Sequence, residues 1–291
     1  RREADSAFGR ANILAQTYNQ INRDFGSPGE DFGVFNSYET FESSLRELAS
    51  TPETPALQNS ALAAARELVN EFNILATSTN DLRQTADRNI AEAVGTVNET
   101  LYKIQNLNGL IGALGQNSGE AVALEDDRQR QLDTLSELLP VKAVTNQDGS
   151  LDILTEDGVF LLSGSVKELS FEQASIIPTG SRYGDGSGVL SGLFVDGQEL
   201  TPGTQGNFAL QTGILAGHFA VRDDVTTSFT TQLDSIAADL VTRFSDDALD
   251  PPVTGGGGDA GSITASASDN EISANLTEYG LLGDQLESAP P

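Results

Sequence analysis

The sequence has no cysteine, no methionine, no tryptophan and a single histidine, His218. Without cysteine the chain can form no disulfide, no thiolate zinc site and no thiol nucleophile. A metal motif built from two histidines of this chain is excluded as well. A chain of 291 residues without methionine is expected to be a processed or trimmed piece of a longer protein. This composition offers little of the material from which catalytic pockets are built.

Positive charge is also scarce, because 16 Lys and Arg stand against 43 Asp and Glu, a net charge of −27. Nucleic acids and anionic membrane surfaces are bound by clustered basic side chains. No apolar run approaches the roughly 18 residues of a membrane span, and no signal peptide opens the chain. We therefore expect neither a nucleic-acid nor a membrane partner. The length predicts about two domains.

The N-terminal half has helical periodicity. In residues 1–25 apolar residues recur at steps of three and four, which predicts a helix whose stripe faces a core. The stripe consists of Ala4, Phe8, Ala11, Ala15, Tyr18 and Phe25, with Ile21 or Asn22 between the last two. A shorter helix follows, with Phe35, Phe41, Leu45 and Leu48 on its apolar face.

The longest periodic segment runs from Leu68 to Ile104 at about 3.6 residues per step, the period of a straight α-helix. Proline is absent from 56 to 139. A helix from about Ala56 to Leu114 would be roughly 90 Å long, which favours an elongated helical bundle. A further helix ends at about Leu139.

After Pro140 the period changes to short apolar runs separated by Asp-Gly pairs, at 148–149, 157–158, 185–186 and 196–197. These pairs are hairpin signals and predict a small antiparallel β domain. Helical periodicity returns between Val221 and Phe244, and we expect this helix to pack back on the first ones. The predicted fold class is α+β: an elongated bundle of long, coiled-coil-like helices with an inserted antiparallel β domain.

Four segments follow from this pattern. They are a helical domain (1–139), the inserted β domain (140–216), a return helix (217–250) and a Gly/Pro-rich acidic tail (251–291), which is expected to be flexible. Within the tail, Ser268 and Glu271 form a possible capping box for a short helix.

Several features suggest a site, and a structural interpretation is favoured for each. Glu125, Asp126 and Asp127 could bind a cation, but acids are also typical of a helix N-terminus. The loop 183–188 lacks the ligands of an EF-hand and the lysine of a P-loop, and Gly255–Gly258 lacks that lysine too. His218 has no evident partner for acid–base chemistry. The triplets at Asn98 and Asn275 match glycosylation sites by chance. We predict no catalytic, cofactor or metal residues, and no enzyme.

One stretch resembles a known family. Residues 124–144, LEDDRQRQLDTLSELLPVKAV, join an acidic–arginine step, paired leucines and Leu-Ser-Glu-Leu to a following strand. This pattern resembles a signature of the flagellar hook-associated protein FlgK family. Gln129, Pro140 and Ala143 differ from the family's commoner Asp, Gly and Val. The matching residues are Asp126, Arg128, Leu132, Leu135, Ser136, Glu137, Leu138 and Val141.

The break at 48–52 with the helix after it, and the stretch 213–234, resemble the same family in the same order, so the likeness covers about residues 4–250. It implies a structural subunit of the bacterial flagellum that forms the junction between hook and filament and is needed for filament assembly. The implied partners are copies of itself, the hook protein, the second hook–filament junction protein and, for the full-length protein, an export chaperone. The implied location is extracellular, on the flagellum, after export through the flagellar type III channel. No cofactor is implied. The family's terminal helices, which build its inner tube, are missing from the chain.

Two alternatives remain. A flagellin or a subunit like the second junction protein would share the helical hairpins. A secreted adhesin or hydrolase would have its activity in the β insert, and a pocket with a carboxylate pair of shifted pKa would favour that.

Overall fold

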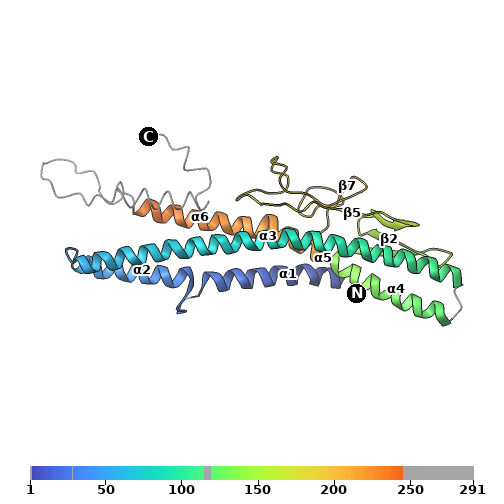
Figure 1. The fold of residues 1–291 in the computed structure, drawn as a ribbon, viewed down its shortest axis with the longest axis horizontal. Coiled ribbons are helices and arrows are strands. Elements are labelled where there is room, and N and C mark those ends of the chain that lie inside the picture. The colour runs from blue at the N-terminus through green and yellow to red at the C-terminus, as the bar shows by residue number, and fades with distance from the viewer. Residues whose placement is uncertain (1, 28, 115–118, 245–291) are drawn as a thin grey trace. The chain divides into compact units, whose positions relative to one another are not determined.

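A computed structural model describes residues 2–27, 29–114 and 119–244 (Figure 1). The predicted tail at 251–291, with Gly255–Gly258, Asn275 and the possible short helix, lies outside these residues. The chain forms two compact units. Unit 1 comprises residues 1–18 and 82–226, and unit 2 comprises residues 19–81 and 227–291. The four-segment division drawn from the sequence remains a prediction.

Long helices dominate both units, as the sequence predicts. The long ones are α1 (Arg2–Phe25), α2 (Gly33–Ser50), the 60-residue α3 (Pro55–Leu114), α4 (Gly119–Leu138) and α6 (Thr226–Arg243), and the short α5 (Gly213–Ala220) and π-helix η1 (Val221–Val225) precede α6. The predicted bounds of α3 are correct to within one residue. None of the helices in the described ranges is long and apolar enough to span a membrane.

Two glycines reverse the chain between α1 and α2 in unit 2. Gly26 and Gly33 both have a φ of +81°, in the left-handed region. A Cβ on either would lie 2.7 Å from a backbone oxygen, of Phe32 or Phe25 respectively. Glycine is therefore required at both positions, for its conformation and for its lack of a side chain.

The predicted antiparallel β segment is confirmed, as two small sheets in unit 1. The first has the order β1-β2-β3-β4, and the second the order β5-β6-β7. Their bounds are β1 Val141–Thr145, β2 Leu151–Thr155, β3 Phe160–Ser163, β4 Ser165–Val166, β5 Leu169–Ser170, β6 Phe194–Val195 and β7 Gln198–Glu199.

The Asp-Gly pairs do not all have the role that the sequence suggests. Asp196 and Gly197 have φ values of 49° and 77° and connect β6 to β7, as expected of a turn with two left-handed residues. Asp185-Gly186, in contrast, lies in the long segment between β5 and β6, where no strand is formed. There the pair closes a loop and not a hairpin.

Each unit has its own apolar core. In unit 1, Val97, Leu101 and Ile104 of α3 pack with residues of α4, both sheets and α5. In unit 2, Leu233 and Ala237 of α6 pack with Phe72 of α3 and its neighbours on α2. The last helix thus contacts the N-terminal helices within unit 2.

The prediction for α1 is wrong about which face is buried up to Tyr18, whereas at its end Ile21 is buried and Phe25 packs against the core of unit 2. Phe8 and Tyr18 are 71% and 52% exposed, and the alanines of the predicted stripe are exposed with them. Between residues 4 and 18 the buried positions are Ser6, Gly9 and Thr17. A Cβ at Gly9 would lie 2.9 Å from the carbonyl oxygen of Glu137, at the end of α4. The inner face is therefore selected for close backbone approach, which a hydrophobic pattern does not reveal.

Candidate functional site

The candidate site residues considered from the sequence either make structural contacts or lie apart from other reactive groups. On α4, Asp127 forms an ion pair with Arg130. In the loop 183–188, Asp185 accepts hydrogen bonds from Ser187 and from the N–H of Arg182, which lower its pKa to about 2. Burial alone lowers the pKa of His218 to about 4, so this imidazole is neutral at pH 7. Within the ranges given above, no three potential ligands are grouped to hold a metal ion.

The most concentrated charges in unit 1 are buried between α3 and η1. Arg222 is fully buried and contacts Asp87 Oδ1 through Nη1 and Asp223 Oδ2 through Nη2, both at 2.8 Å. Arg83, on the same face of α3 as Asp87, donates from Nε to the carbonyl oxygen of Arg222 at 2.9 Å. Two cations and two anions thus lie together and their charges balance, with Arg83, Asp87 and Arg222 buried and Asp223 16% exposed.

The π-helix is part of this arrangement. An extra residue in a helical turn disturbs the regular pairing of carbonyl oxygens, and such turns are often found at functional sites. Here the carbonyl oxygen of Arg222 accepts hydrogen bonds from the side chains of Arg83 and, at 3.2 Å, Thr226. The guanidinium carbon of Arg222 lies 4.8 Å from the ring centroid of Phe219 and 5.7 Å from that of Phe171, within cation–π range.

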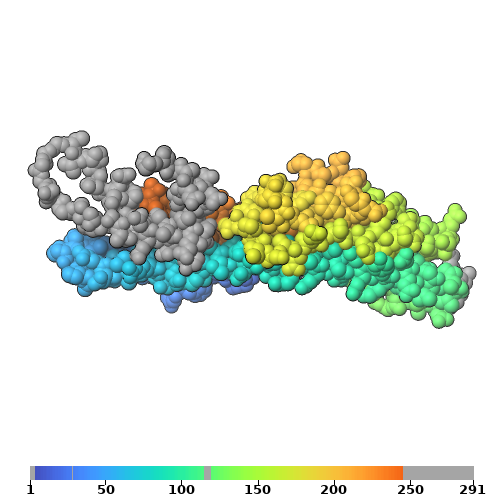
Figure 2. All heavy atoms as spheres, turned by 45° about the horizontal axis from the view of Figure 1, so that its top comes forward, coloured from blue at the N-terminus to red at the C-terminus, as the bar shows by residue number. Residues whose placement is uncertain are grey.

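The charged groups also hold the strand-free segment between β5 and β6. The backbone N–H of Ala174 donates to Asp87 Oδ2 at 2.8 Å. Arg83 Nη1 donates to the Pro178 carbonyl at 3.0 Å, and Arg222 Nη2 donates to the Ser191 carbonyl at 3.2 Å. A segment with almost no sheet pairing is thereby attached to α3. Figure 2 shows this region, in yellow, lying against the helix.

Two asparagines of α3 also hold the sheets, through hydrogen bonds from their side-chain amides to backbone groups. Asn98 donates to the carbonyl of Leu169 at 2.9 Å and accepts from its N–H at 2.8 Å. Asn108 does the same with Leu151, at 2.9 and 3.1 Å. Each amide side chain therefore acts as a strand partner to the first residue of β5 or β2. The triplet at Asn98 has this structural role.

Replacing Asn98 with aspartate is expected to lower the free energy of unfolding by about 1–3 kcal/mol. The carboxylate keeps the size of the amide but loses the donor, so it faces the carbonyl oxygen of Leu169 without a proton. Urea denaturation followed by circular dichroism would measure the loss. Asn106→Asp is the matched control, because Asn106 is exposed on the same helix. Equal losses in the two variants would contradict the proposed pairing.

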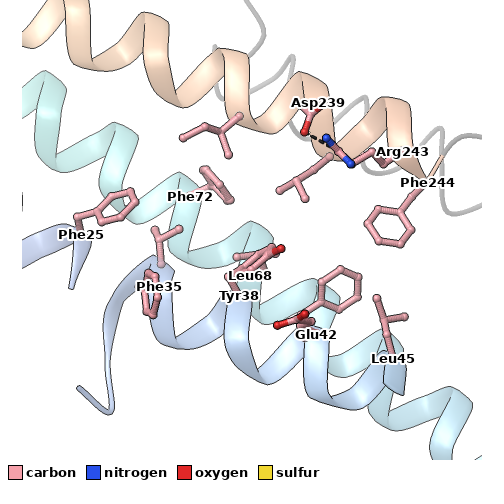
Figure 3. Close-up of a pocket in the computed structure, with 14 residues that line it drawn as sticks. Phe25, Phe35, Tyr38, Glu42, Leu45, Leu68, Phe72, Asp239, Arg243 and Phe244 are labelled. Atoms are coloured by element: carbon pink, nitrogen blue, oxygen red, sulfur yellow. Dashed lines mark hydrogen bonds and ion pairs between the residues drawn. The ribbon is translucent and has the colours of Figure 1, made fainter. Parts of the chain in front are cut away.

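Unit 2 contains an apolar groove of about 570 Å³ between α2, α3 and α6 (Figure 3). The rings of Phe41 and Phe244 lie 5.4 Å apart at its edge. Its charged lining groups are paired, Asp239 with Arg243 and Glu42 with Arg46, both at 2.6 Å. The groove therefore presents an apolar wall without a free charge for acid–base chemistry. It is lined by Phe25, Val34, Phe35, Tyr38, Phe41, Glu42, Leu45, Leu68, Phe72, Ile236, Asp239, Leu240, Arg243 and Phe244.

Sequence reasoning missed the buried charges and the asparagine pairs. Arg83 and Asp87 stand four positions apart beside the apolar stripe of α3, a spacing that is usual for an exposed helical ion pair. Asp87 and Arg222 are 135 positions apart, so no local pattern could join them. The arrangement connects elements of unit 1, and its Asp223 also lines a small pocket of about 170 Å³ beside Asp224 and Arg182.

Comparisons with known proteins agree with the fold. The model of the flagellar hook-associated protein FlgK helical domain matches residues 11–247. Flagellar hook-associated protein 1 of Salmonella typhimurium is 27% identical over 146 residues, covering 49% of this chain and 26% of the relative. The Escherichia coli protein of the same name is 24% identical over 171 residues, covering 58% and 31%.

The solved structure of the flagellar hook junction protein FlgK from Burkholderia pseudomallei has a TM-score of 0.61 and 18% identity, covering 83% of this chain and 42% of that one. At this identity the likeness shows a shared fold. The chain spans about a quarter to a third of the length of the curated relatives it matches.

Proposed function

The chain belongs to the flagellar hook-associated protein FlgK family, and on that basis we propose that it is part of a structural subunit of the bacterial flagellum. The match to the family's helical domain over residues 11–247 carries the proposal. The whole protein forms the junction between hook and filament and is required for filament assembly. It acts outside the cell, after export through the flagellar type III channel.

The contacts of unit 1 support a structural role. The charged side chains of this region form the ion pairs and hydrogen bonds that join α3, η1 and the β segment. Arg222 and Asp87 are 0% and 1% exposed there. Ion pairs and paired amides resist sliding of packed elements, because any shift would leave buried polar groups unsatisfied. A subunit placed between two tubes must keep its shape under load. The protein is not an enzyme.

The proposed partners are copies of the protein itself, the hook protein and the second hook–filament junction protein. An export chaperone binds the full-length protein before assembly. Helical assemblies arise from heterologous interfaces whose rotation does not close, so one surface of the subunit contacts a different surface of the next. The full-length protein is the form that assembles.

The alternative of a hydrolase or adhesin acting through the β insert has less support. Ile153, Leu161 and Leu193 are fully buried there, and they form a continuous apolar core with the helices. The family match favours FlgK over flagellin.

Deleting the gene tests the proposed function. The cells are expected to form hooks without filaments and to lose flagellin to the medium, because the junction on which the filament assembles is missing. Electron microscopy of the hooks and immunoblotting of the medium would measure this. The full-length gene should restore swimming, whereas a gene for residues 1–291 alone should not. Normal filaments on the deletion strain would contradict the junction role.

A further inference from the structure

The apolar groove of unit 2 leaves large side chains uncovered in its wall. Tyr38, Ile236 and Phe244 line the groove and are 44%, 43% and 37% exposed. Tyr38 lies on α2 and Phe244 follows the end of α6 (Figure 3). An apolar groove between helices typically accepts another helix, which buries apolar residues spaced along one of its faces.

The sequence after α6 contains a segment with this spacing, which we call the tail segment (268–280). Ser268 and Glu271 are spaced as a capping box, and Gly280 is of the type that most often ends a helix. Between these signals three apolar residues stand at positions i, i+4 and i+7, on one face of a helix. They are Ile272, Leu276 and Tyr279. The tail segment lies outside the described residues, and its sequence alone predicts this helix.

A helix as short as the tail segment needs an apolar surface on which to form. Isolated helices shorter than about 12–15 residues are marginal in water, and most helical stability in proteins comes from packing an apolar face. The groove is a surface of this kind and has room for several side chains, at about 570 Å³. Docking would therefore cover both the groove and the apolar face of the segment.

The connectivity of the chain favours the tail segment over other occupants. Phe244 lines the groove, and 27 residues separate it from Ile272. A glycine-rich linker of that length spans about 30 Å on average, which gives an effective concentration on the order of millimolar. A second copy would have to approach against a net charge of −27 on each molecule. Any part of a longer protein that precedes Arg1 is attached to unit 1, and any that follows Pro291 is attached farther from the groove.

The charges of the tail segment also suit the groove. Arg243 lines the groove, and Arg46 pairs with the lining residue Glu42. Both arginine side chains are more than half exposed, and exposed i,i+4 ion pairs contribute little to stability. The two guanidinium groups can therefore turn to the carboxylates of a docked helix. The tail segment has three acids and no lysine or arginine: Asp269, Glu271 and Glu278.

We propose that the tail segment docks in the groove as a short helix, with Ile272, Leu276 and Tyr279 against the apolar wall. It adds a helix to unit 2 beside α2, α3 and α6. The inference goes beyond the proposed function and does not rest on it, because it concerns contacts within one chain. Its test uses the purified protein and does not involve filament attachment.

Tryptophan fluorescence of the 291-residue chain tests the docking. The sequence has no tryptophan, so all indole emission of Tyr38→Trp comes from the groove. Adding Ile272→Asp or Leu276→Asp should shift this emission to longer wavelength and raise acrylamide quenching about twofold or more, because a carboxylate in the apolar groove expels the helix and admits water. Circular dichroism would verify that the long helices remain folded.

Tyr102→Trp is the matched control, because Tyr102 is 47% exposed on α3 in unit 1, close to the 44% of Tyr38. Its emission and quenching should not change with either tail substitution. If Tyr38→Trp were equally insensitive to both, the proposal would be overturned. Protection that grows with protein concentration would also overturn it, since a second copy would then fill the groove. Protection found only in the full-length protein would assign the groove to parts outside this chain, with the same result.

Cysteine cross-linking gives a second readout of the same contact. Because the sequence has no cysteine, a pair of introduced thiols reports only on its own approach. Leu276→Cys is combined in turn with Tyr38→Cys, Leu45→Cys and Ile236→Cys, three positions that line the groove. At least one pair should close a disulfide within the monomer about tenfold faster than Leu276→Cys with Ile74→Cys.

Ile74 serves as the control position because it is 53% exposed on α3 in unit 2 and is not among the described residues that line the groove. Its thiol has the same tether to the tail segment, so it measures chance encounter. Equal rates for all four pairs would count against the docking. Disulfides that form mainly between molecules would do so as well, because the tail would then reach the groove of another copy.

Discussion

Replacing Arg222 with methionine is expected to lower the free energy of unfolding by about 3–5 kcal/mol. The substitution leaves Asp87, which is 1% exposed, as a buried carboxylate without its cation. It also removes the guanidinium group that lies over Phe219 and binds the carbonyl of Ser191. Urea denaturation of the purified chain, followed by circular dichroism, would measure the loss.

Two control variants distinguish the cost of leaving a charge buried from the cost of losing an ion pair. Arg243→Met breaks an ion pair whose side chains are 69% and 60% exposed, and it should cost less than about 1 kcal/mol. The double variant Arg222→Met/Asp87→Leu removes both buried charges and should recover much of the stability, because an apolar pair needs no hydration. If Arg222→Met cost no more than Arg243→Met, the buried ion pair would not hold unit 1 together.

Replacing Asp234 with asparagine is expected to stabilise the chain at neutral pH. Asp234 lies on α6 in unit 2, and its Oδ1 is buried without a hydrogen-bond partner. Burial raises the pKa of this carboxyl to about 6. A rise from an ordinary value near 3.8 corresponds to about 3 kcal/mol, which partial exposure of the group reduces to roughly 1–2 kcal/mol.

The sign of the pH dependence follows from the raised pKa. Protonated Asp234 is favoured in the folded chain, so its stabilising contribution is complete below about pH 4 and is lost as the pH rises through about 6. The gain from Asp234→Asn should therefore be large at about pH 7.5 and small at about pH 4. Thermal melts of both proteins at matched pH would measure it. Asp239→Asn, at an exposed carboxylate on the same helix, is the control. A gain that does not change with pH would contradict this account.

His218 in unit 1 contributes a pH dependence of the opposite sign. Its pKa is lowered to about 4, so its contribution is present above the ordinary value of 6.5 and is lost as the pH falls through 4. Acid therefore acts in opposite directions at these two groups. Comparing each variant with its parent at the same pH isolates the effect of Asp234.

Much of the fold could be predicted from local pattern. The period between Leu68 and Ile104, together with the lack of proline, predicted α3, because helical spacing and intact backbone donors are local properties. Three of the four Asp-Gly pairs predicted hairpins for an equally local reason, since Asp-Gly readily adopts the left-handed conformation that tight turns need, whereas Asp185-Gly186 closes a loop. The resemblance of residues 124–144 to FlgK agrees with the match to the family's helical domain.

By itself, then, the sequence determined the element types, the antiparallel insert and the family. Only the tertiary structure decided which face of α1 is buried and which distant charges meet. Gly9 and Ser6 face inward because a close backbone approach to α4 and α5 requires small residues, and this leaves Phe8 and Tyr18 outside. Asp87 meets Arg222 because η1 folds back along α3, and that approach depends on packing between segments far apart in the chain. Hydrophobic periodicity reports how apolar each face is, but it does not report how closely two backbones must approach.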